Sequence, residues 1–440
     1  MRRIYEARAY ETQQTCYWSE TLPKRDWPMA DGDTSADVAI IGAGFTGLNA
    51  AIPLAQQGID VVVIDAETPG WGASGRNGGF CCLGGAKASD AMLRRRFGAS
   101  GPSDWRDTEK AAVDHVERMM ASHGIEADRH SEGETLLAHT PQAFDKIKAD
   151  VSRLSQSYGT VPRLHDPVEL QTLGMGGPWH GGVTLPLGFA LNPAKYHAGL
   201  VGVAERTGVR FRLRSPALDL RAAATGWTVT TPQGTVRARK VILATNGYSS
   251  ENLPHWLRAR YLPVQSSIIV TRPLTLAEQA AQGWTSAQMA YDTRHLLHYF
   301  RLLPDGRFLF GMRGGLRATA AAQKRIARKI RADFHRLFPE WQRVEITHEW
   351  SGLVCLMAGL VPFCGPVPGH TGLYAGLGFH GNGVAMGSYV GKLLAALVVG
   401  SSRRGPWPEA MRKTPSRFPL GRYRRLLLAP AYWSAAILDL

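Results

Sequence analysis

The chain has 440 residues, of which 44% are hydrophobic, and a formal net charge of +15, so it can build a large core and two interleaved domains. Its five cysteines are odd in number and irregular in spacing, which indicates free thiols, and no C-x-x-C pair predicts a zinc site. Neither H-E-x-x-H nor G-x-S-x-G occurs, so hydrolytic and metal-dependent mechanisms lose their usual support.

The N-terminal segment, residues 1–35, has no apolar run that could act as a signal peptide. Nor does the chain contain a stretch of about 18 apolar residues, so the sequence predicts no transmembrane helix. We therefore expect a cytoplasmic protein in which residues 1–35 form an N-terminal extension.

A glycine-rich turn follows the first predicted strand. Residues 37–41 are β-branched and apolar after the leading aspartate, which indicates a short buried strand. Gly42, Gly44 and Gly47 then form G-x-G-x-x-G. The first glycine permits the tight turn, the second lets the backbone approach a pyrophosphate, and the third lets the next helix pack on the sheet.

The helix after this turn is predicted to end at Gly58, with a kink at Pro53. Its N-terminus would direct free N–H groups and a partial positive charge at the pyrophosphate. A second strand, residues 60–64, ends at Asp65, whose carboxylate can accept hydrogen bonds from both ribose hydroxyls. Together these elements predict a dinucleotide-binding unit; the alternative is a loop with chance glycines.

Two later segments are predicted to return the chain to the same sheet. Asn192 and Pro193 are typical of an N-cap and a first helical residue, and the helix they begin is expected to end at Gly208. Residues 209–248 alternate like a β-meander.

The stretches 89–190 and 255–347 are the candidates for a substrate domain. In the second stretch, "SSIIVTRPL", "LLHYFRLLP" and "RFLFGMRGG" predict strands of an antiparallel sheet, with a Pro-Asp-Gly turn between the last two. The two-residue period of a strand places Tyr299 and Arg301 on one face and His298 on the other.

The positive charge is concentrated in three clusters, at Arg94–Arg96, Lys324–Arg331 and Arg422–Arg425. An acidic partner is therefore possible in principle, whether RNA, anionic lipid or an acidic protein. In the middle cluster, apolar residues at helical spacing favour the simpler interpretation, the solvated side of an amphipathic helix. Residues 422–440 could rest on a membrane surface, but Pro430 interrupts them and their apolar part is short. We expect the whole C-terminal tail, residues 401–440, to pack on the domain of the glycine turn.

Several further segments resemble one known family. "GWGASGRNGGF" (70–80) resembles the loop that wraps the flavin in the D-amino-acid-oxidase superfamily, which includes glycine oxidase and monomeric sarcosine oxidase. "KVILATNGY" (240–248) is similar to its second dinucleotide-contacting strand, and "GLYAGLGFHGNGVAMGSYVGKLLAALV" (372–398) to its last strand and helix. The likeness covers most of the chain in the same order, and within the superfamily it is greatest to the bacterial gamma-glutamylputrescine oxidase type.

The resemblance implies an α/β fold: a Rossmann-like FAD-binding domain with an interleaved α+β substrate domain built on an antiparallel sheet. Residues 36–88, 191–254 and 348–400 are expected to form the FAD-binding domain, and residues 89–190 and 255–347 the substrate domain. The predicted cofactor-binding residues are Gly42, Gly44, Phe45, Thr46, Gly47, Asp65, Ala66, Ala73, Ser74, Arg76, Asn77, Gly78, Gly79, Thr245, Asn246, Gly247, Gly378, His380, Gly381, Asn382, Gly383 and Val384.

Four residues are the predicted catalytic set. By resemblance, the helix N-terminus after "GFHGNGV" (378–384) faces the pyrimidine end of the flavin ring and stabilises negative charge there. His380 and Asn382 are expected to contact the ring or the substrate, unless they only hold the loop. Tyr299 and Arg301 are expected to orient the amine or a substrate carboxylate, unless they face outward on a half-exposed strand.

The resemblance implies removal of hydride from a carbon that bears a neutral amine, giving an imine that water hydrolyses. "EWSGLVCLM" (349–357) resembles a glycine-oxidase segment whose arginine clamps the substrate carboxylate, but that position here is Val354. This departure favours an amine like gamma-glutamylputrescine over a short amino acid such as glycine, sarcosine or a D-amino acid. FAD is expected to be noncovalent, although Cys355 lies near a position of covalent attachment in sarcosine oxidases.

Two different functions are also compatible with the sequence. A tRNA-directed flavoenzyme acting on a modified uridine would suit the basic charge, but the basic clusters are not interleaved with aromatic residues, so a nucleic-acid partner is not expected. A flavin-binding protein without turnover has no positive support. Oxygen and a quinone-linked acceptor are both candidates for reoxidising the flavin.

Overall fold

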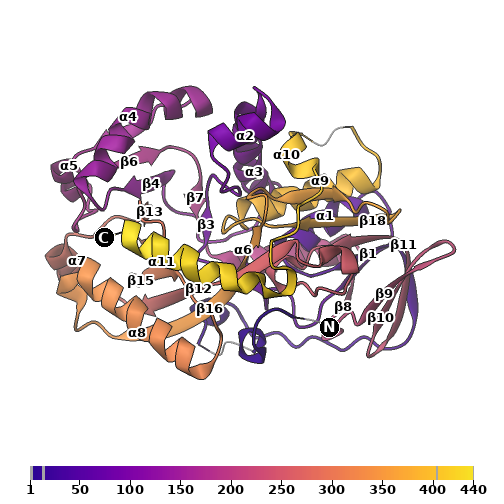
Figure 1. Ribbon diagram of the computed structural model, residues 1–440. Helices are drawn as coiled ribbons and strands as arrows, with labels where there is room; N and C mark the ends of the chain where they lie inside the picture. The colour runs from indigo at the N-terminus through magenta and orange to yellow at the C-terminus, as the bar shows by residue number, and fades with distance from the viewer. Residues whose placement is uncertain (1–2, 12–14, 403–404, 440) are drawn as a thin grey trace.

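The computed structural model describes residues 3–11, 15–402 and 405–439, and it places two eight-stranded sheets side by side (Figure 1). The first, here called the nucleotide sheet, has the order β17-β18-β11-β1-β2-β8, with β10 on β11 and β9 on β10. Its strands are β1 (Thr34–Ile41), β2 (Val61–Ile64), β8 (Arg210–Arg212), β9 (Asp219–Ala223), β10 (Gly226–Thr231), β11 (Gly234–Leu243), β17 (Phe363–Pro366) and β18 (Leu373–Leu377).

The second sheet, here called the substrate sheet, has the order β16-β12-β15-β14-β13-β4-β6-β5. Its strands are β4 (Glu134–Leu137), β5 (Arg163–His165), β6 (Gly182–Leu185), β12 (Tyr261–Thr271), β13 (Met289–Asp292), β14 (His298–Leu302), β15 (Phe308–Arg313) and β16 (Ile346–Met357). A short pair, β3 (Phe80–Cys81) and β7 (Phe189–Ala190), forms a third sheet.

The α-helices of the described chain flank these sheets. They are α1 (Phe45–Ala55), α2 (Asp90–Phe97), α3 (Gly101–His123), α4 (Pro141–Tyr158), α5 (Pro167–Thr172), α6 (Pro193–Arg206), α7 (Leu276–Gln282), α8 (Ala320–Leu337), α9 (Ala385–Val398), α10 (Glu409–Arg412) and α11 (Leu428–Leu438).

The nucleotide sheet is parallel where it carries the glycine turn. β1 pairs in parallel with β2 and β11, and β11 pairs in parallel with β18. Helices α1 and α9 pack closely, since a Cβ on Gly391 would lie 2.3 Å from the carbonyl oxygen of Thr46. The predicted strand, turn, helix and strand are therefore confirmed, although α1 ends at Ala55 rather than Gly58 and continues through Pro53.

The substrate sheet is antiparallel through β16, β12, β15, β14 and β13, and the sequence predicted such strands where β12, β14 and β15 lie. Gly306 makes the turn between β14 and β15 with a φ of +81°. Helix α8 buries Ile330, Phe334 and Leu337 and exposes Lys324 and other basic residues, so the middle basic cluster is the solvated side of an amphipathic helix.

Two parts of the predicted domain division differ from the structure. Residues 348–357 belong to β16, which pairs along its length with β12 of the substrate sheet rather than with the nucleotide sheet. Helix α3 packs on α9 and buries Trp105 and Val116 in the core of the nucleotide sheet, because its apolar residues have the helical spacing of one face. Helix α6 was expected to end at Gly208 but ends at Arg206.

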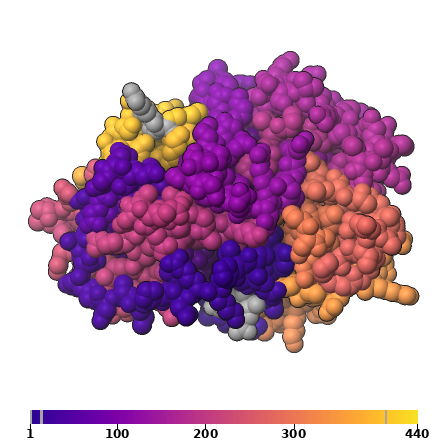
Figure 2. Space-filling model, turned by 180° about the vertical axis from the view of Figure 1, so that it is seen from behind, coloured from indigo at the N-terminus to yellow at the C-terminus, as the bar shows by residue number. Residues whose placement is uncertain are grey.

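The N-terminal extension is packed on the molecule. Figure 2 shows its indigo atoms spread along the lower part of the face opposite to that of Figure 1. Trp18 is buried there, its ring centroid lies 6.3 Å from that of Trp350, and its Nε1 donates to the carbonyl oxygen of Asn77 over 2.8 Å. The extension therefore contacts both the loop of residues 70–80, here called the flavin loop, and the substrate sheet.

The C-terminal residues were predicted to pack on the FAD-binding domain, and for α11 this is wrong. Leu428 is buried with Leu262 and Val264 of β12, and the Asp439 carboxylate accepts the backbone N–H groups of His295 and Leu296. Pro430 is the third residue of α11, where a proline removes no intrahelical hydrogen bond, so it does not interrupt the helix.

Candidate active site

The three glycines of the turn occupy positions that no larger residue could take without a shift. Gly42 has a φ of +115°, and a Cβ there would lie 2.8 Å from the carbonyl oxygen of Ala244. A Cβ on Gly47 would lie 1.9 Å from the carbonyl oxygen of Gly42, and one on Gly44 would lie 2.8 Å from Ser74 Oγ. The turn is therefore a tight backbone cradle at the N-terminus of α1, which suits a pyrophosphate.

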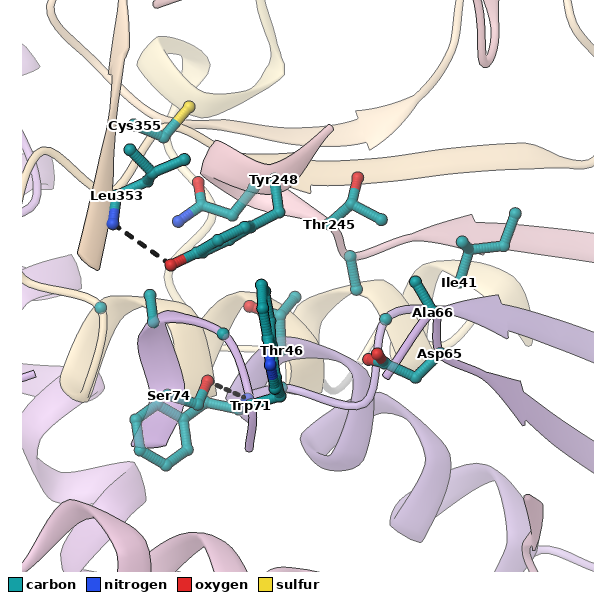
Figure 3. Close-up of a pocket in the computed structure, with 18 of the residues that line it drawn as sticks. Ile41, Thr46, Asp65, Ala66, Trp71, Ser74, Thr245, Tyr248, Leu353 and Cys355 are labelled. Carbon is teal, nitrogen blue, oxygen red and sulfur yellow. Dashed lines mark hydrogen bonds between the residues drawn. The ribbon is translucent and has the colours of Figure 1, made fainter. Parts of the chain in front are cut away.

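The cradle opens into a cavity, here called the cofactor cavity, whose empty volume is about 1410 Å³ with open solvent included. Figure 3 shows Asp65 at one end of it and Leu353 and Cys355 at the other. The Asp65 carboxylate accepts the backbone N–H groups of Ala43, over 2.7 Å, and Glu67, over 2.9 Å. Burial raises the pKa of Asp65, and the two N–H groups fix its carboxylate beside the cradle.

The loop of residues 70–80 closes one wall of this cavity. Ser74 Oγ accepts the backbone N–H of Phe45 over 3.0 Å, which ties the loop to the first turn of α1 (Figure 3). Asn77 Nδ2 donates to two carbonyl oxygens earlier in the loop, and the Arg76 guanidinium lies 4.1 Å from the ring centroid of Trp71.

The opposite wall comes from three segments that lie far apart in the chain. Asn246, with a φ of +43°, accepts the backbone N–H of Gly378 on its Oδ1 over 2.9 Å. The backbone N–H of Leu353 donates to the Tyr248 hydroxyl over 3.3 Å. These contacts join the ends of β11 and β18 to β16 over the cavity.

Most of the predicted cofactor residues meet at this cavity. Those that line it are Gly42, Gly44, Phe45, Thr46, Asp65, Ala66, Ala73, Ser74, Asn77, Thr245, Asn246, Gly381 and Gly383. The predicted residues that are not among its lining are Gly47, Arg76, Gly78, Gly79, Gly247, Gly378, His380, Asn382 and Val384. Gly47, Gly79 and Gly378 instead allow close packing, because a Cβ on any of them would lie within 2.1 Å of another atom.

A second cavity, here called the substrate cavity, adjoins the first. The two share Ala73, Asn77, Leu353, Val354 and Gly381 as lining residues. The substrate cavity also has four charged lining residues, namely Arg76, Lys87, Glu134 and Arg313.

The environment of this cavity shifts the pKa values of its charged groups. The positive charge of Arg313, together with burial, lowers the pKa of Lys87 to about 7. Burial raises the pKa of Glu134 to about 8, against the opposing hydrogen bond from the Tyr291 hydroxyl to its Oε1 over 3.2 Å. Near neutral pH the cavity thus holds a titrating amine and a protonated carboxyl group beside a guanidinium.

Two members of the predicted catalytic set line the substrate cavity. Asn382 donates to the carbonyl oxygen of Leu83 over 2.6 Å, so it ties the loop before α9 to the loop after β3. The Tyr299 hydroxyl reaches across Gly311 of β15 and lies 2.9 Å from Ser266 Oγ on β12. Both side chains are within reach of a ligand in this cavity.

His380 does not have the position expected of a catalytic residue. It is fully buried, its Nδ1 donates to the carbonyl oxygen of Gly85 over 2.8 Å, and its Nε2 accepts the backbone N–H of Met357 over 3.1 Å. Burial lowers its pKa to about 4, which keeps the ring neutral. Because both ring nitrogens are used by backbone groups, His380 holds the loop rather than facing either cavity.

Arg301 also differs from expectation. It is fully buried outside the lining of both cavities, where it donates to the carbonyl oxygen of Leu191 over 2.7 Å and to His130 Nε2 over 2.9 Å. It lies on the same face of β14 as Tyr299, but the strand carries it past the cavity and behind Phe80. Arg313 on the neighbouring strand β15 is the arginine of the substrate cavity.

Lys87, Glu134 and Tyr291 line the substrate cavity and were not predicted from the sequence. Lys87 follows the flavin loop by a few residues, and this nearness was the only sequence signal. Glu134 is the first residue of β4, and Tyr291 lies within β13. These two short strands pair in parallel in the substrate sheet. Their meeting depends on a pairing between residues far apart in the chain.

Val354 and Cys355 lie where the two cavities meet. Val354 lines both cavities, so the position of the carboxylate-clamping arginine of glycine oxidases is occupied here by an uncharged side chain. Cys355 lines the cofactor cavity, and burial raises the pKa of its thiol to about 12. A protonated thiol is a poor nucleophile, which agrees with noncovalent FAD.

The fold and the glycine cradle define a dinucleotide-dependent oxidoreductase. The glycines at 42, 44 and 47, where a Cβ would lie too close to other atoms, leave the backbone bare for the FAD pyrophosphate, so the residues present fit this cofactor. A family model described as FAD dependent oxidoreductase (DAO) matches residues 37–397. The chain therefore belongs to the D-amino-acid-oxidase family of FAD-dependent oxidoreductases, with FAD as cofactor and a C–N bond of an amine or amino acid as the site of oxidation.

Individual relatives agree with this assignment. The chain is 32% identical over 417 residues to a probable oxidoreductase, OrdL, of Rhizobium meliloti (strain 1021), covering 94% of each chain. It is 26% identical over 405 residues to the gamma-glutamylputrescine oxidoreductase of Escherichia coli (strain K12), covering 91% of this chain and 92% of the relative. The crystal structure of glycine oxidase from Geobacillus kaustophilus superposes with a TM-score of 0.71 at 19% identity, covering 86% of this chain and 98% of the other.

Proposed function

We propose that the protein oxidises the C–N bond of a primary amine whose carboxylate lies remote from the reacting carbon, as in gamma-glutamylputrescine. Val354 stands where glycine oxidases have the arginine that binds the substrate carboxylate, and the observation that carries this proposal is that Arg313 offers a guanidinium elsewhere. Arg313 lines the substrate cavity but not the cofactor cavity. A guanidinium in a buried cavity binds a carboxylate through two parallel hydrogen bonds. The full-length likeness to the gamma-glutamylputrescine oxidoreductase supports the same substrate class.

The amine end of the substrate would meet a different part of the same cavity. Glu134, Tyr291 and Tyr299 supply oxygen atoms that can bind an ammonium or amine nitrogen. Lys87, whose pKa is about 7, can accept the ammonium proton at neutral pH, which leaves the amine in the neutral form that oxidation requires.

FAD, when bound, supplies the hydride acceptor for the carbon that bears the amine, and the resulting imine is hydrolysed by water. The N-terminus of α9, reached through the turn Phe379–Val384, adds a partial positive charge beside the shared wall of the two cavities. Charge that develops there during reduction is stabilised without any reorganisation of the protein.

A second candidate function has one specific observation in its favour. A Cβ on Gly381 would lie 3.4 Å from a terminal nitrogen of Arg313, and Gly381 lines both cavities. Arg313 therefore lies near enough to the shared wall to hold the carboxylate of a short amino acid such as glycine or sarcosine. Substrate length separates the two functions.

The test is anaerobic mixing of the FAD-loaded protein with substrates of different length, followed by the loss of flavin absorbance. We expect gamma-glutamylputrescine to reduce the flavin much faster than glycine, sarcosine or D-alanine. Arg313→Lys should weaken the apparent affinity for gamma-glutamylputrescine about 30-fold or more, the factor that corresponds to about 2 kcal/mol. Its FAD content should be unchanged, because Arg313 does not line the cofactor cavity.

The matched control is Arg307→Lys, in the turn that leads into β15 and outside both cavities. It should leave apparent affinity unchanged. Rapid reduction by glycine or sarcosine that is lost in Arg313→Lys would replace the proposal with the short amino-acid function. Reduction by any of these substrates that does not depend on Arg313 would contradict both functions.

A further inference from the structure

Exposed apolar side chains are concentrated near the C-terminal end of the described chain. Among the large hydrophobic residues that are exposed, a cluster here called the C-terminal apolar surface comprises Leu420, Tyr423, Leu426, Trp433, Ile437 and Leu438. Trp433 is 78% exposed and Ile437 is 67% exposed. Trp433 and Ile437 are four residues apart on α11, so they lie on the same face of the helix. Contiguous exposed apolar surface usually marks an interaction site.

Helix α11 carries most of this surface and is covered on one side only. Its inner side packs through Leu428 and Tyr432 on a cluster that includes Leu262 and Val264 of β12. In Figure 1 the yellow helix α11 lies in front of β12. No charged residue occurs from Leu426 to Leu438, so the outer side is apolar as well. A helix that is apolar all round is normally buried all round, so the outer side of α11 is expected to have a partner.

The charges just before α11 in the chain indicate what that partner is. Arg417 and Arg422 are exposed, and no aspartate or glutamate occurs from residue 410 to residue 438. A second copy of the chain would bring two such clusters together, with a net charge of +15 on each molecule. An anionic lipid surface offers the opposite charge and an apolar interior beneath it.

We infer that the protein docks on anionic membranes through the C-terminal apolar surface. Trp433 and Ile437 enter the boundary between headgroups and acyl chains, and the exposed arginines before α11 contact lipid phosphates. Trp433 suits this position because its ring is apolar and its indole N–H is polar. The docking is peripheral, since the described residues contain no helix that could cross a bilayer.

The experiment is sedimentation of the FAD-loaded protein with vesicles of phosphatidylcholine, with and without phosphatidylglycerol. We expect binding to the anionic vesicles, weakened by salt, and little binding to the neutral ones. The double variant Trp433→Ser/Ile437→Ser should bind the anionic vesicles at least about tenfold more weakly than the wild type, because two exposed apolar anchors are removed. Its FAD content and circular dichroism should be unchanged, since both side chains face solvent.

The matched control is Val168→Ser/Leu276→Ser, which removes two apolar side chains that are 71% and 82% exposed elsewhere on the molecule. It should bind anionic vesicles like the wild type. The inference is overturned if the wild type does not sediment with anionic vesicles, if neutral vesicles bind it equally, or if the control loses as much binding. It is also overturned if light scattering finds a dimer that Trp433→Ser/Ile437→Ser abolishes, because the surface would then be a contact between two copies.

Discussion

Lys87 and Arg313 line the same buried cavity, and the repulsion between their positive charges lowers the pKa of Lys87, so that this side chain can accept a proton. The charge of Arg313 and burial lower the pKa of Lys87 to about 7, whereas burial raises the pKa of the Glu134 carboxyl group to about 8. A base with a pKa near the working pH combines availability with driving force. When a carboxylate binds Arg313, the repulsion weakens and Lys87 becomes a stronger base.

At the residue scale we predict a pH dependence that belongs to Lys87. The neutral amine is the proton-accepting form, so the rate of anaerobic flavin reduction should rise as pH increases through about 7 and then level off. Lys87→Met should lower this rate about 100-fold or more and remove the dependence. Stopped-flow measurements from about pH 5.5 to about pH 9 check both results.

Two variants identify the group responsible. Lys392→Met, on α9 and outside both cavities, should behave like the wild type. If the rise with pH persists in Lys87→Met and disappears in Glu134→Gln, the titrating group is Glu134 and the assignment to Lys87 is wrong.

At the scale of elements, a buried charged cluster fastens α8 to two strands of the substrate sheet. His298 on β14 contacts Asp292 of β13 through Nδ1, over 2.8 Å, and Asp333 of α8 through Nε2, over 3.3 Å. Burial alone would lower the pKa of His298, but the two carboxylates overcome it and raise the pKa above the ordinary value, while the pKa values of Asp292 and Asp333 are lowered. The face of β14 opposite to Tyr299 is therefore a structural one.

We predict that His298→Gln lowers the free energy of unfolding by about 3 kcal/mol at about pH 5.5, because it removes a charge from a buried network. The raised pKa of His298 means that its contribution is fully present below the ordinary value of 6.5 and is lost as pH rises through the higher folded value. The difference from wild type should therefore shrink at about pH 8.5. Denaturant unfolding at both pH values, with excess FAD, measures it.

The control for this cluster is His255→Gln, at an exposed position outside it. It should leave the free energy of unfolding almost unchanged at either pH. A loss in His298→Gln that is equal at the acidic and the alkaline pH would mean that the imidazole contributes by packing and not by charge.

At the scale of the whole molecule, the cofactor cavity is closed by segments from along most of the chain: the glycine turn, the flavin loop, the end of β11, β16 and the loop before α9. Such a cavity can hold FAD by many contacts without a covalent bond. Oxygen and a quinone-linked acceptor are both still candidates for reoxidation, and docking through α11 would favour the second, since quinones dissolve in the bilayer.

We predict that acid precipitation releases the flavin into the supernatant, because the buried Cys355 thiol has a pKa of about 12 and stays protonated. Absorbance of the supernatant and the pellet measures the two fractions, and Cys355→Ser should have the wild-type FAD content. Yellow colour that stays in the wild-type pellet and is lost in Cys355→Ser would establish a covalent link.

The sequence alone determined the features that depend on neighbouring residues. Gly42 and Gly47 are required by a turn that closes within a few residues. The continuous apolar run of β1 predicts a buried strand, and the apolar period of α8 fixes which of its faces is buried. These are local steric and packing constraints, so they could be predicted together with the family, the fold class and the sheet directions.

Only the tertiary structure decided which side chains meet. Arg301 has the predicted face but lies behind Phe80, and His380 has the predicted place in the chain but is bonded to two backbone groups. Lys87 and Arg313 are brought into one cavity by two separate segments, and their pKa values depend on that distance and on burial. Charge and hydrogen bonding act through space rather than along the chain, so no pattern of neighbouring residues records them.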